Sequence, residues 1–186
     1  MRRIIASSLM TLDGVVEDPG GYAGTTFGGW ALPYFDEEAV RRSIEKLSGC
    51  DYFLCGRRTY EMFAAAWGDA DGPYADRLRS LPKLVASTTL TGELTWNASL
   101  LTGDAVDALK QLKQEDGDDI MMYGNPRLLR TLLENGLVDQ LDISLHPVVL
   151  GTGTKLFEAG SPRTQLTFIS QTALPSGVTI HSYQPA

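Results

Sequence analysis

Two adjacent arginines, Arg57 and Arg58, stand where an apolar run ends and a helical pattern begins, in the stretch FLCGRRTYEMF. The first turn of a helix exposes backbone N–H groups without intrahelical partners, and these groups together with the helix dipole favour an anion. A guanidinium adds a planar fork of donors that matches a phosphate. Gly56, the two arginines and Thr59 therefore indicate a phosphate site, although arginines at helix starts are often simply solvated.

Phosphate-compatible groups also follow two later apolar runs. They are Ser87, Thr88 and Thr89 after KLVA, and Gly124 and Asn125 after DIMMY. In an open α/β sheet, ligands bind outside the carboxyl ends of the strands, so groups at successive strand ends can meet around one ligand. The three strand ends together predict a phosphate site, and they favour a dinucleotide as its ligand.

The elements that hold these groups alternate along the chain. Strands are expected at residues 3–9, 50–55, 83–88 and 119–124, and helices begin near Asp36, Arg57, Asp104 and Pro126. Asn125 has the side chain of an N-cap, and Pro126 suits the first position of a helix. Between the first strand and the first helix, a long glycine-rich stretch has no helical period, and loops of this length are often functional.

The alternation of strands and helices stops in the last third of the sequence, where only strand patterns follow. Residues 139–150 have the pattern of a strand, and residues 165–172 and 177–184 form a hairpin pattern around ALPSG. We therefore predict a three-layer α/β sandwich, with a mostly parallel central sheet and antiparallel C-terminal strands, as a single domain over residues 1–186.

The composition narrows the class of protein. The 186 residues carry a net charge of -7 and no basic stripe, so a nucleic-acid partner is not expected. A membrane span needs about 20 apolar residues in a row, and the N-terminal apolar run breaks at Thr11 and Asp13. We expect no membrane partner and no targeting signal, and the expected compartment is the cytoplasm.

The two cysteines, Cys50 and Cys55, do not suggest a disulfide. Five residues apart on one strand, they would lie roughly 16 Å apart on opposite faces, which excludes a bond between them. The chain has only two histidines, so a zinc site is not expected either.

The sequence resembles the dihydrofolate reductase superfamily, and more closely the reductase domain of the bifunctional riboflavin-biosynthesis deaminase/reductase and its free-standing relatives. SLMTLDGVVE, FLCGRRTYEMF and KLVASTTL are similar to the opening strand, the Gly-Arg-x-Thr turn and the third strand of that family. IMMYGNPRLLRTLLENGLVDQLDISLHPVVLGTGTKLF is similar to its closing segment and is the most specific piece. The resemblance covers nearly the whole chain.

The resemblance implies NADPH as the cofactor and hydride transfer to a C=N-type or sugar-derived carbon. It implies cofactor-phosphate contacts at Arg57, Arg58 and Thr59, a 2′-phosphate contact near Ser87 and Thr88, and pyrophosphate contacts along Gly124, Asn125, Arg127 and Leu128. Gly56, Thr89 and Tyr123 complete the expected cofactor site.

Two positions depart from the family pattern. Relatives usually have consecutive glycines where this chain has Gly124, Asn125 and Pro126. Glycine permits close backbone approach, whereas proline has no N–H to donate. Riboflavin reductases typically carry a glutamate before those glycines, and Tyr123 stands there in this chain, which counts against the riboflavin intermediate as the substrate.

Hydride transfer also requires a proton source and exclusion of water. Asp13 and Asp36 are the candidate catalytic carboxylates, with a turn role for Asp13 and an N-cap role for Asp36 as the alternatives. Trp30, Tyr34 and Phe35 could stack on a planar heterocycle or simply cover the core. His146, which precedes Pro147, is more typical of a packed strand residue than of a catalyst.

The sequence thus favours an NADPH-dependent reductase of the dihydrofolate-reductase-like fold, acting on a small heterocyclic or sugar-linked molecule. Reduction of 5-amino-6-(5-phosphoribosylamino)uracil is one form of this hypothesis. A non-catalytic nucleotide-binding or regulatory module is the alternative. The exposed edges expected for the C-terminal strands also predict a homodimer.

Overall fold

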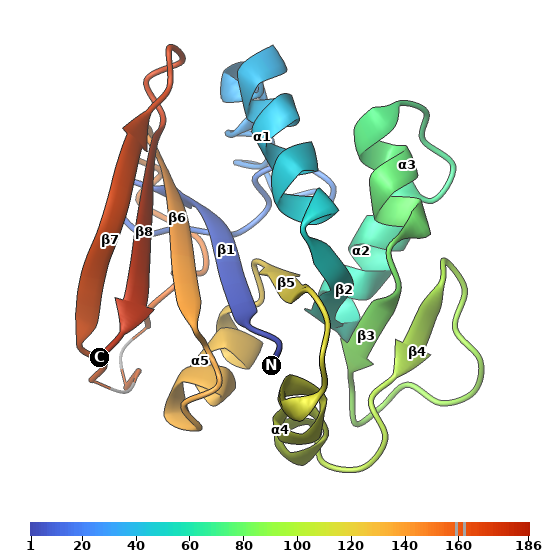
Figure 1. Ribbon diagram of the computed structural model, residues 1–186. Coiled ribbons are helices and arrows are strands. Elements are labelled where there is room, and N and C mark those ends of the chain that lie inside the picture. Colours follow the sequence, from blue (N-terminus) through green and yellow to red (C-terminus); the bar gives the residue numbers. More distant parts are fainter. Residues whose placement is uncertain (159, 162) are drawn as a thin grey trace.

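The computed structural model describes residues 1–158, 160–161 and 163–186 (Figure 1). Its strands are β1 (Ile4–Thr11), β2 (Cys50–Gly56), β3 (Lys83–Ala86), β4 (Ala98–Leu100), β5 (Asp119–Tyr123), β6 (Gln140–His146), β7 (Leu166–Ala173) and β8 (Thr179–Pro185). Its helices are η1 (Leu32–Tyr34), α1 (Glu37–Ser48), α2 (Arg57–Trp67), α3 (Pro73–Ser80), α4 (Ala105–Gln114) and α5 (Pro126–Glu134).

The strands form one sheet in the order β4-β3-β2-β5-β1-β6-β8-β7. Every neighbouring pair from β4 to β6 is parallel, whereas β8 pairs antiparallel with both β6 and β7. The prediction of a mostly parallel sheet with antiparallel C-terminal strands is confirmed.

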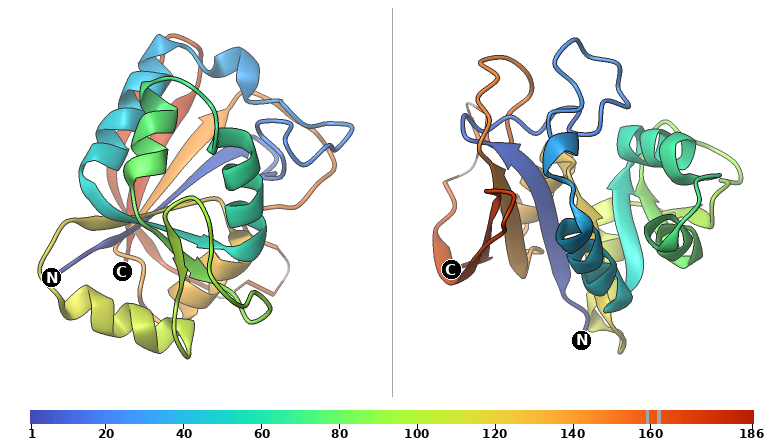
Figure 2. Two further views of the ribbon diagram at one scale, coloured as in Figure 1. Left: turned by 90° about the vertical axis from the view of Figure 1, so that its right-hand side faces the viewer. Right: turned by 90° about the horizontal axis from the view of Figure 1, so that it is seen from above.

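Two apolar clusters pack on opposite faces of the sheet. One joins Ile4, Ala6 and Met122 to leucines of α4 and α5, and the other joins Ile5, Phe53 and Met121 to side chains of α1, α2 and α3. Consecutive residues of a strand, such as Ile4 and Ile5, serve opposite clusters because side chains alternate across a sheet. The two views of Figure 2 show the helices on both sides of the sheet, which makes the three layers.

Three local features differ from the sequence prediction. The edge strand β4 has only three residues and was not predicted. The strand expected over residues 139–150 ends at His146, because the following Pro147 has no N–H for the ladder. Asn125 occupies the predicted N-cap position of α5, but its backbone is left-handed and its side chain makes no capping hydrogen bond.

The glycine-rich loop between β1 and α1 is ordered by one buried carboxylate. Asp18 is 5% exposed and accepts hydrogen bonds from the backbone of Ala23 and from the backbone and hydroxyl of Thr25. The loop also meets the segment after β6, because Val15 and Lys155 form an antiparallel bridge. Figure 2 shows these two loops projecting from the same end of the sheet.

Among the described residues, no helix combines the length and the apolar character that a bilayer crossing requires.

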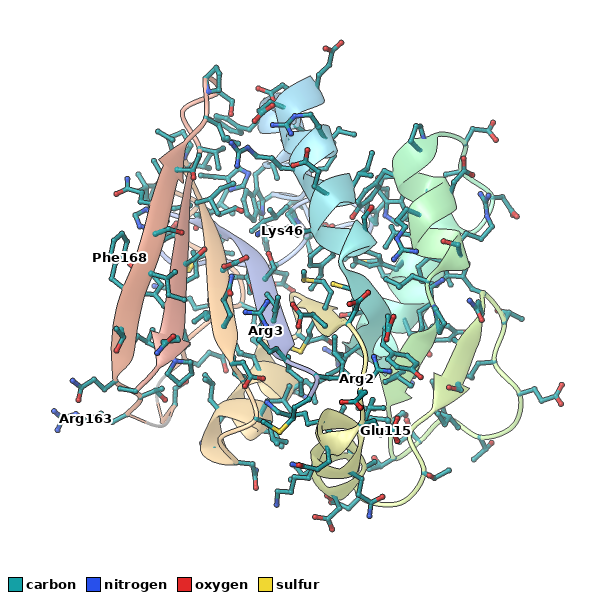
Figure 3. All side chains as sticks on the ribbon, viewed as in Figure 1. Arg2, Arg3, Lys46, Glu115, Arg163 and Phe168 are labelled. Atoms are coloured by element: carbon teal, nitrogen blue, oxygen red, sulfur yellow. The ribbon has the colours of Figure 1, made fainter. Side chains whose placement is uncertain are left out.

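A buried ion pair joins α1 to the antiparallel part of the sheet. Lys46 Nζ lies 2.6 Å from Asp142 Oδ2, and Oδ1 of Asp142 accepts from Gln140 Nε2 and Ser182 Oγ. Figure 3 shows Lys46 reaching from α1 toward the strands. Burial raises the pKa of Asp142, but Lys46 and the hydrogen bonds outweigh burial and hold it below its ordinary value. Asp142 is therefore a charged carboxylate inside the fold.

We predict that Lys46→Met destabilises the protein by about 3–5 kcal/mol at pH 7, because it leaves a buried charge without its partner. The pKa of Asp142 is lower in the folded than in the unfolded chain. The pair therefore contributes stability above about pH 4, and this contribution is lost as the pH falls through the folded-state pKa. Urea unfolding at pH 7 and at lower pH measures both effects.

Arg130→Met is the matched control, since Arg130 makes an exposed i, i+4 pair with Glu134 within one helix. This substitution should cost less than about 1 kcal/mol. Equal losses for the two variants would contradict a stabilising role for the buried pair.

Candidate functional site

A cavity of about 1210 Å³ opens at the carboxyl ends of the parallel strands. Leu9, Gly56, Ala86, Tyr123 and His146, which lie at or near the ends of five different strands, all line it. Because ligand pockets commonly measure about 300–1,000 Å³, this cavity has room for more than one small molecule.

The first turn of α2 faces this cavity. Arg57 and Arg58 line it, are exposed, and occupy the first two helical positions after Gly56. In the described part of the chain, no side chain caps this helix, and Arg58 makes no ion pair or hydrogen bond. The nearest carboxylate to Arg57 is Glu61, at 3.9 Å. The donors that the sequence assigned to a phosphate are thus mostly available to one.

Asn125 links the two turns that flank the cavity. Its Oδ1 accepts from the Gly56 N–H at 3.0 Å and from the Thr59 hydroxyl at 2.9 Å, while its Nδ2 donates to the Tyr123 carbonyl. The left-handed backbone at Gly124 and Asn125, with φ of 62° and 57°, aims the side chain back toward β2. The Thr59 hydroxyl is therefore engaged within the protein.

The α5 turn supplies further donors. Gly124, Asn125, Arg127 and Leu128 all line the cavity, as the sequence predicted for the pyrophosphate site. The Gly124 N–H donates to the Ser7 carbonyl, and Pro126 has no N–H, so the amides of Asn125, Arg127 and Leu128 are the ones left to a ligand. Apart from Gly124 and its two chain neighbours, no atom of the described residues lies within 4 Å of the point where a Cβ on Gly124 would stand, so the turn is open on that side.

The end of β3 contributes hydroxyl groups. Ser87, Thr88 and Thr89 line the cavity. Ser87 Oγ accepts from the backbone N–H groups of Thr89 and Leu90, which fixes this turn, while Thr88 and Thr89 are exposed. Hydroxyl donors therefore border the same cavity as the arginines.

Aromatic rings surround His146 at the other end of the cavity. Tyr34 and Phe35 line it, whereas Trp30 is 7% exposed and lies behind it. The rings of Trp30 and Tyr34 meet the His146 ring edge-on at 5.2 and 5.5 Å. The Trp30 indole N–H donates to the Glu17 carbonyl. Tyr34 and Phe35 can thus contact a ligand, while Trp30 holds the loop and the histidine.

His146 is neutral in this setting. Burial lowers its pKa, although a hydrogen bond to the Ser144 carbonyl acts in the opposite direction. Because a carbonyl only accepts, Nδ1 carries the proton in the 2.9 Å bond to Ser144. His146 lines the cavity as an uncharged ring.

Hydroxyl groups without a partner among the described residues also line the cavity. Ser7, Ser144 and Tyr123 border the cavity, and within the described chain their hydroxyls make no hydrogen bond. Burial raises the pKa of Tyr123 well above its ordinary value, so this phenol stays protonated and can donate. These groups can bind a polar, uncharged part of a ligand.

The two predicted catalytic carboxylates do not line this cavity. Asp13 accepts hydrogen bonds from the Thr11 hydroxyl and from the backbone of Gly151 and Leu150, which together lower its pKa to about 2. Asp36 caps α1 by accepting from the Ala39 N–H at 2.9 Å. Both carboxylates thus have the structural roles that were the alternatives, and neither is among the residues that line the cavity.

Two cations that were not singled out in the sequence line the cavity from α1. Arg42 and Lys46 are four residues apart and therefore share one face of the helix. Arg42 pairs with Glu38, and Lys46 pairs with Asp142. The i, i+4 spacing of the two cations is visible in the sequence. Because the same spacing is common on solvent-exposed helix faces, it does not by itself indicate that Arg42 and Lys46 line a cavity.

We predict that Asn125→Gly destabilises the protein by about 1–2 kcal/mol, because it removes the acceptor for Gly56 and Thr59. Asn125→Ala should cost about 1 kcal/mol more, since it adds a Cβ in a left-handed backbone without restoring the contact. Urea unfolding of the two variants separates the hydrogen bonds from the backbone strain. If Asn125→Gly has the same free energy of unfolding as the wild type, the hydrogen bonds that link the two turns do not stabilise the protein.

Two sequence comparisons relate this chain to known proteins. The model of the RibD C-terminal domain matches residues 2–180. Uncharacterized protein YyaP of Bacillus subtilis (strain 168) is 29% identical over 182 residues, which cover 95% of this chain and 92% of that protein.

Solved structures share the fold. A Shewanella sp. PV-4 protein named for riboflavin biosynthesis has a TM-score of 0.72 at 22% identity, with 99% of each chain covered. The Thermotoga maritima diaminohydroxyphosphoribosylaminopyrimidine deaminase/5-amino-6-(5-phosphoribosylamino)uracil reductase has a TM-score of 0.67 at 12% identity, with 100% of this chain and 57% of that one covered. Schistosoma mansoni dihydrofolate reductase has a TM-score of 0.61 at 14% identity, with 100% and 99% covered. The fold is therefore dihydrofolate-reductase-like, and the chain belongs to the RibD C-terminal domain family.

Proposed function

We propose that this protein is an NADPH-dependent reductase that transfers hydride to a small heterocyclic or sugar-linked molecule. One observation carries the proposal: a single cavity joins an anion-binding end, at the starts of α2 and α5, to an end lined by aromatic rings and hydroxyl groups. Family membership supports the same reaction class, since the Thermotoga maritima relative is named as a uracil-derivative reductase.

The residues at the first end fit the phosphates of a dinucleotide. The uncapped amides of α2, the guanidinium groups of Arg57 and Arg58, and the hydroxyls of Thr88 and Thr89 are all donors. The whole chain is acidic, at -7, yet this end presents two adjacent cations. Such a donor set selects anions, and guanidinium forks suit phosphate.

The residues at the second end suit an acceptor molecule. Bound NADPH would supply the hydride. Tyr34 and Phe35 offer apolar faces that exclude water, and the hydroxyls of Ser7, Ser144 and Tyr123 can orient polar atoms of the acceptor. We assign proton donation to Tyr123 in place of Asp13 and Asp36, since its protonated phenol borders the cavity and has no hydrogen-bond partner among the described residues.

The cations on α1 favour an acceptor with an anionic group. Arg42 and Lys46 line the cavity, each with a carboxylate partner that orients it. A phosphorylated sugar would suit this pair, so 5-amino-6-(5-phosphoribosylamino)uracil is the first acceptor to test. Tyr123, in place of the usual glutamate, leaves room for a related acceptor instead.

A non-catalytic nucleotide-binding module remains the second candidate, and one observation favours it. Asn125 occupies the Gly56 N–H and the Thr59 hydroxyl, two donors that the resemblance had assigned to the cofactor site. A protein of this kind would bind NADPH and never oxidise it.

We predict that NADPH raises the melting temperature of the protein, with a stabilisation of about 2.7 kcal/mol at 100 times its Kd. Arg57→Ala combined with Arg58→Ala should abolish the shift, because it removes both guanidinium groups from the phosphate end. NADH, which lacks the 2′-phosphate, should shift the melting temperature little. Thermal unfolding with each cofactor measures this.

Arg41→Ala is the matched control, since Arg41 is an arginine on α1 that pairs with Glu38 and Glu45 on the helix surface. It should keep the full NADPH shift. The cofactor assignment would be refuted by a protein that binds neither nucleotide, and the role of the arginine pair by a double variant that binds NADPH normally.

We further predict that the protein oxidises NADPH when 5-amino-6-(5-phosphoribosylamino)uracil is the acceptor, and that Tyr123→Phe lowers kcat about a hundredfold. Removing the hydroxyl takes away the proton donor but leaves the ring in place. Binding of NADPH to Tyr123→Phe should stay as in the wild type. NADPH binding without turnover of this acceptor would contradict riboflavin-pathway reduction, and a lack of turnover with related heterocyclic acceptors as well would support the non-catalytic module.

A further inference from the structure

A second tyrosine, Tyr74 near the start of α3, lines the same cavity as Tyr123 of β5. Within the described chain, neither phenol makes a hydrogen bond. Their oxygens are also not among the fully enclosed polar atoms that lack a partner, whereas Ser8 Oγ is one of these. Both hydroxyl groups are therefore reached from the cavity and are available to a molecule inside it.

The ring of Tyr74 is held by aromatic neighbours from two other segments. Trp67, the last residue of α2, meets it edge-on with ring centroids 4.9 Å apart, and Phe35, ahead of α1, meets it edge-on at 6.4 Å. Trp67 also contacts Tyr22 of the glycine-rich loop, at 6.1 Å. Edge-to-face contacts of this kind favour one orientation of a ring. The Tyr74 hydroxyl is thus positioned before a ligand arrives, which lowers the entropy that binding costs.

Both phenols carry their protons. Burial raises the pKa of Tyr74 and of Tyr123 above their ordinary values. The neighbouring Tyr74 adds to the rise at Tyr123, so the two side chains are close enough to influence each other. Each phenol can therefore donate one hydrogen bond to a ligand that lies between them.

The elements around these two tyrosines contribute no carboxylate to the cavity. Among the described residues, α1, α2, α3 and β5 line it only with apolar side chains, hydroxyl groups and cations. The carboxylates that line the cavity lie on other segments, and they are Glu17, Asp18, Asp104 and Glu158. A ligand that faces α1, α3 and β5 therefore meets mainly donors, and these favour acceptor atoms on the ligand.

We propose that Tyr74 and Tyr123 bind two carbonyl oxygens of a planar heterocycle, and that they select a dioxo ring over its diamino counterpart. A carbonyl oxygen accepts the phenol proton, while Phe35 and Phe63 offer apolar surface to the flat ring. An amino group can donate to a phenol oxygen, but the phenol proton is then left without an acceptor, which is unfavourable. The inference rests on the proposed reductase function, since it names the class of acceptor that the site takes.

Calorimetric titration with two matched pteridines tests the preference. Pteridine-2,4-dione presents two carbonyl oxygens, whereas 2,4-diaminopteridine presents two amino groups on the same ring system. We expect the dione to bind about 25-fold more tightly, because each phenol proton without an acceptor weakens binding roughly fivefold. Each compound is titrated into the free protein and into the protein saturated with NADP⁺, which carries no hydride to transfer.

Tyr74→Phe should weaken binding of the dione about fivefold without weakening binding of the diamine, because it removes the hydroxyl and keeps the ring against Trp67. Tyr52→Phe is the matched control. Tyr52 lies under the guanidinium of Arg2 and is not among the residues that line the cavity. It should bind both pteridines as the wild type does. Circular dichroism and NADP⁺ affinity show whether each variant keeps its fold and its cofactor site.

Failure of this inference and failure of the proposed function have different signatures. A protein that binds neither NADPH nor NADP⁺ would refute the reductase, yet the pteridine preference of the free protein would still decide the role of Tyr74. Equal affinity for the two pteridines, tighter binding of the diamine, no binding of either, or a folded Tyr74→Phe variant that binds the dione like the wild type would each overturn the inference.

Discussion

Parallel pairing of the strands from β4 to β6 is the constraint on which the rest of the structure depends. It brings the carboxyl ends of these strands to one edge of the sheet, so that α2 and α5, which begin directly after β2 and β5, start side by side. Their dipoles then point positive ends at the same space. An acidic chain thereby gathers backbone N–H groups and two arginines, the donors of the proposed phosphate site, at one end of its cavity.

Asn125 joins the turn after β5 to the turn after β2. Its left-handed backbone and its bonds to Gly56 and Thr59 fix the distance between the starts of α5 and α2. A glycine pair would leave that space to a ligand, whereas the asparagine fills part of it with its own carbonyl. The hydrogen bonds of Asn125 therefore join the two turns and occupy two donors, so the proposed phosphate site would depend more heavily on Arg57 and Arg58.

Much of the fold could be predicted from the sequence, because strand and helix periods alternate cleanly and end at glycines and prolines. Two kinds of feature could not. The short strand β4 carries too few residues to show a period. The roles of Asp13, Asp142 and Lys46 depend on contacts between residues far apart in the chain, such as Asp13 with Gly151. Local propensity correctly offered a turn role for Asp13 and a capping role for Asp36, but it could not show which carboxylates face the cavity.

We propose above that one cavity at the strand ends binds a nicotinamide dinucleotide through the starts of α2 and α5. The most direct measurement is a two-dimensional ¹H–¹⁵N NMR titration with NADP⁺. We expect the largest amide shifts at Arg57, Arg58, Arg127 and Leu128, with smaller shifts in the turn after β3. Shifts confined to another surface, or saturation by NADP⁺ without any change at these amides, would contradict it.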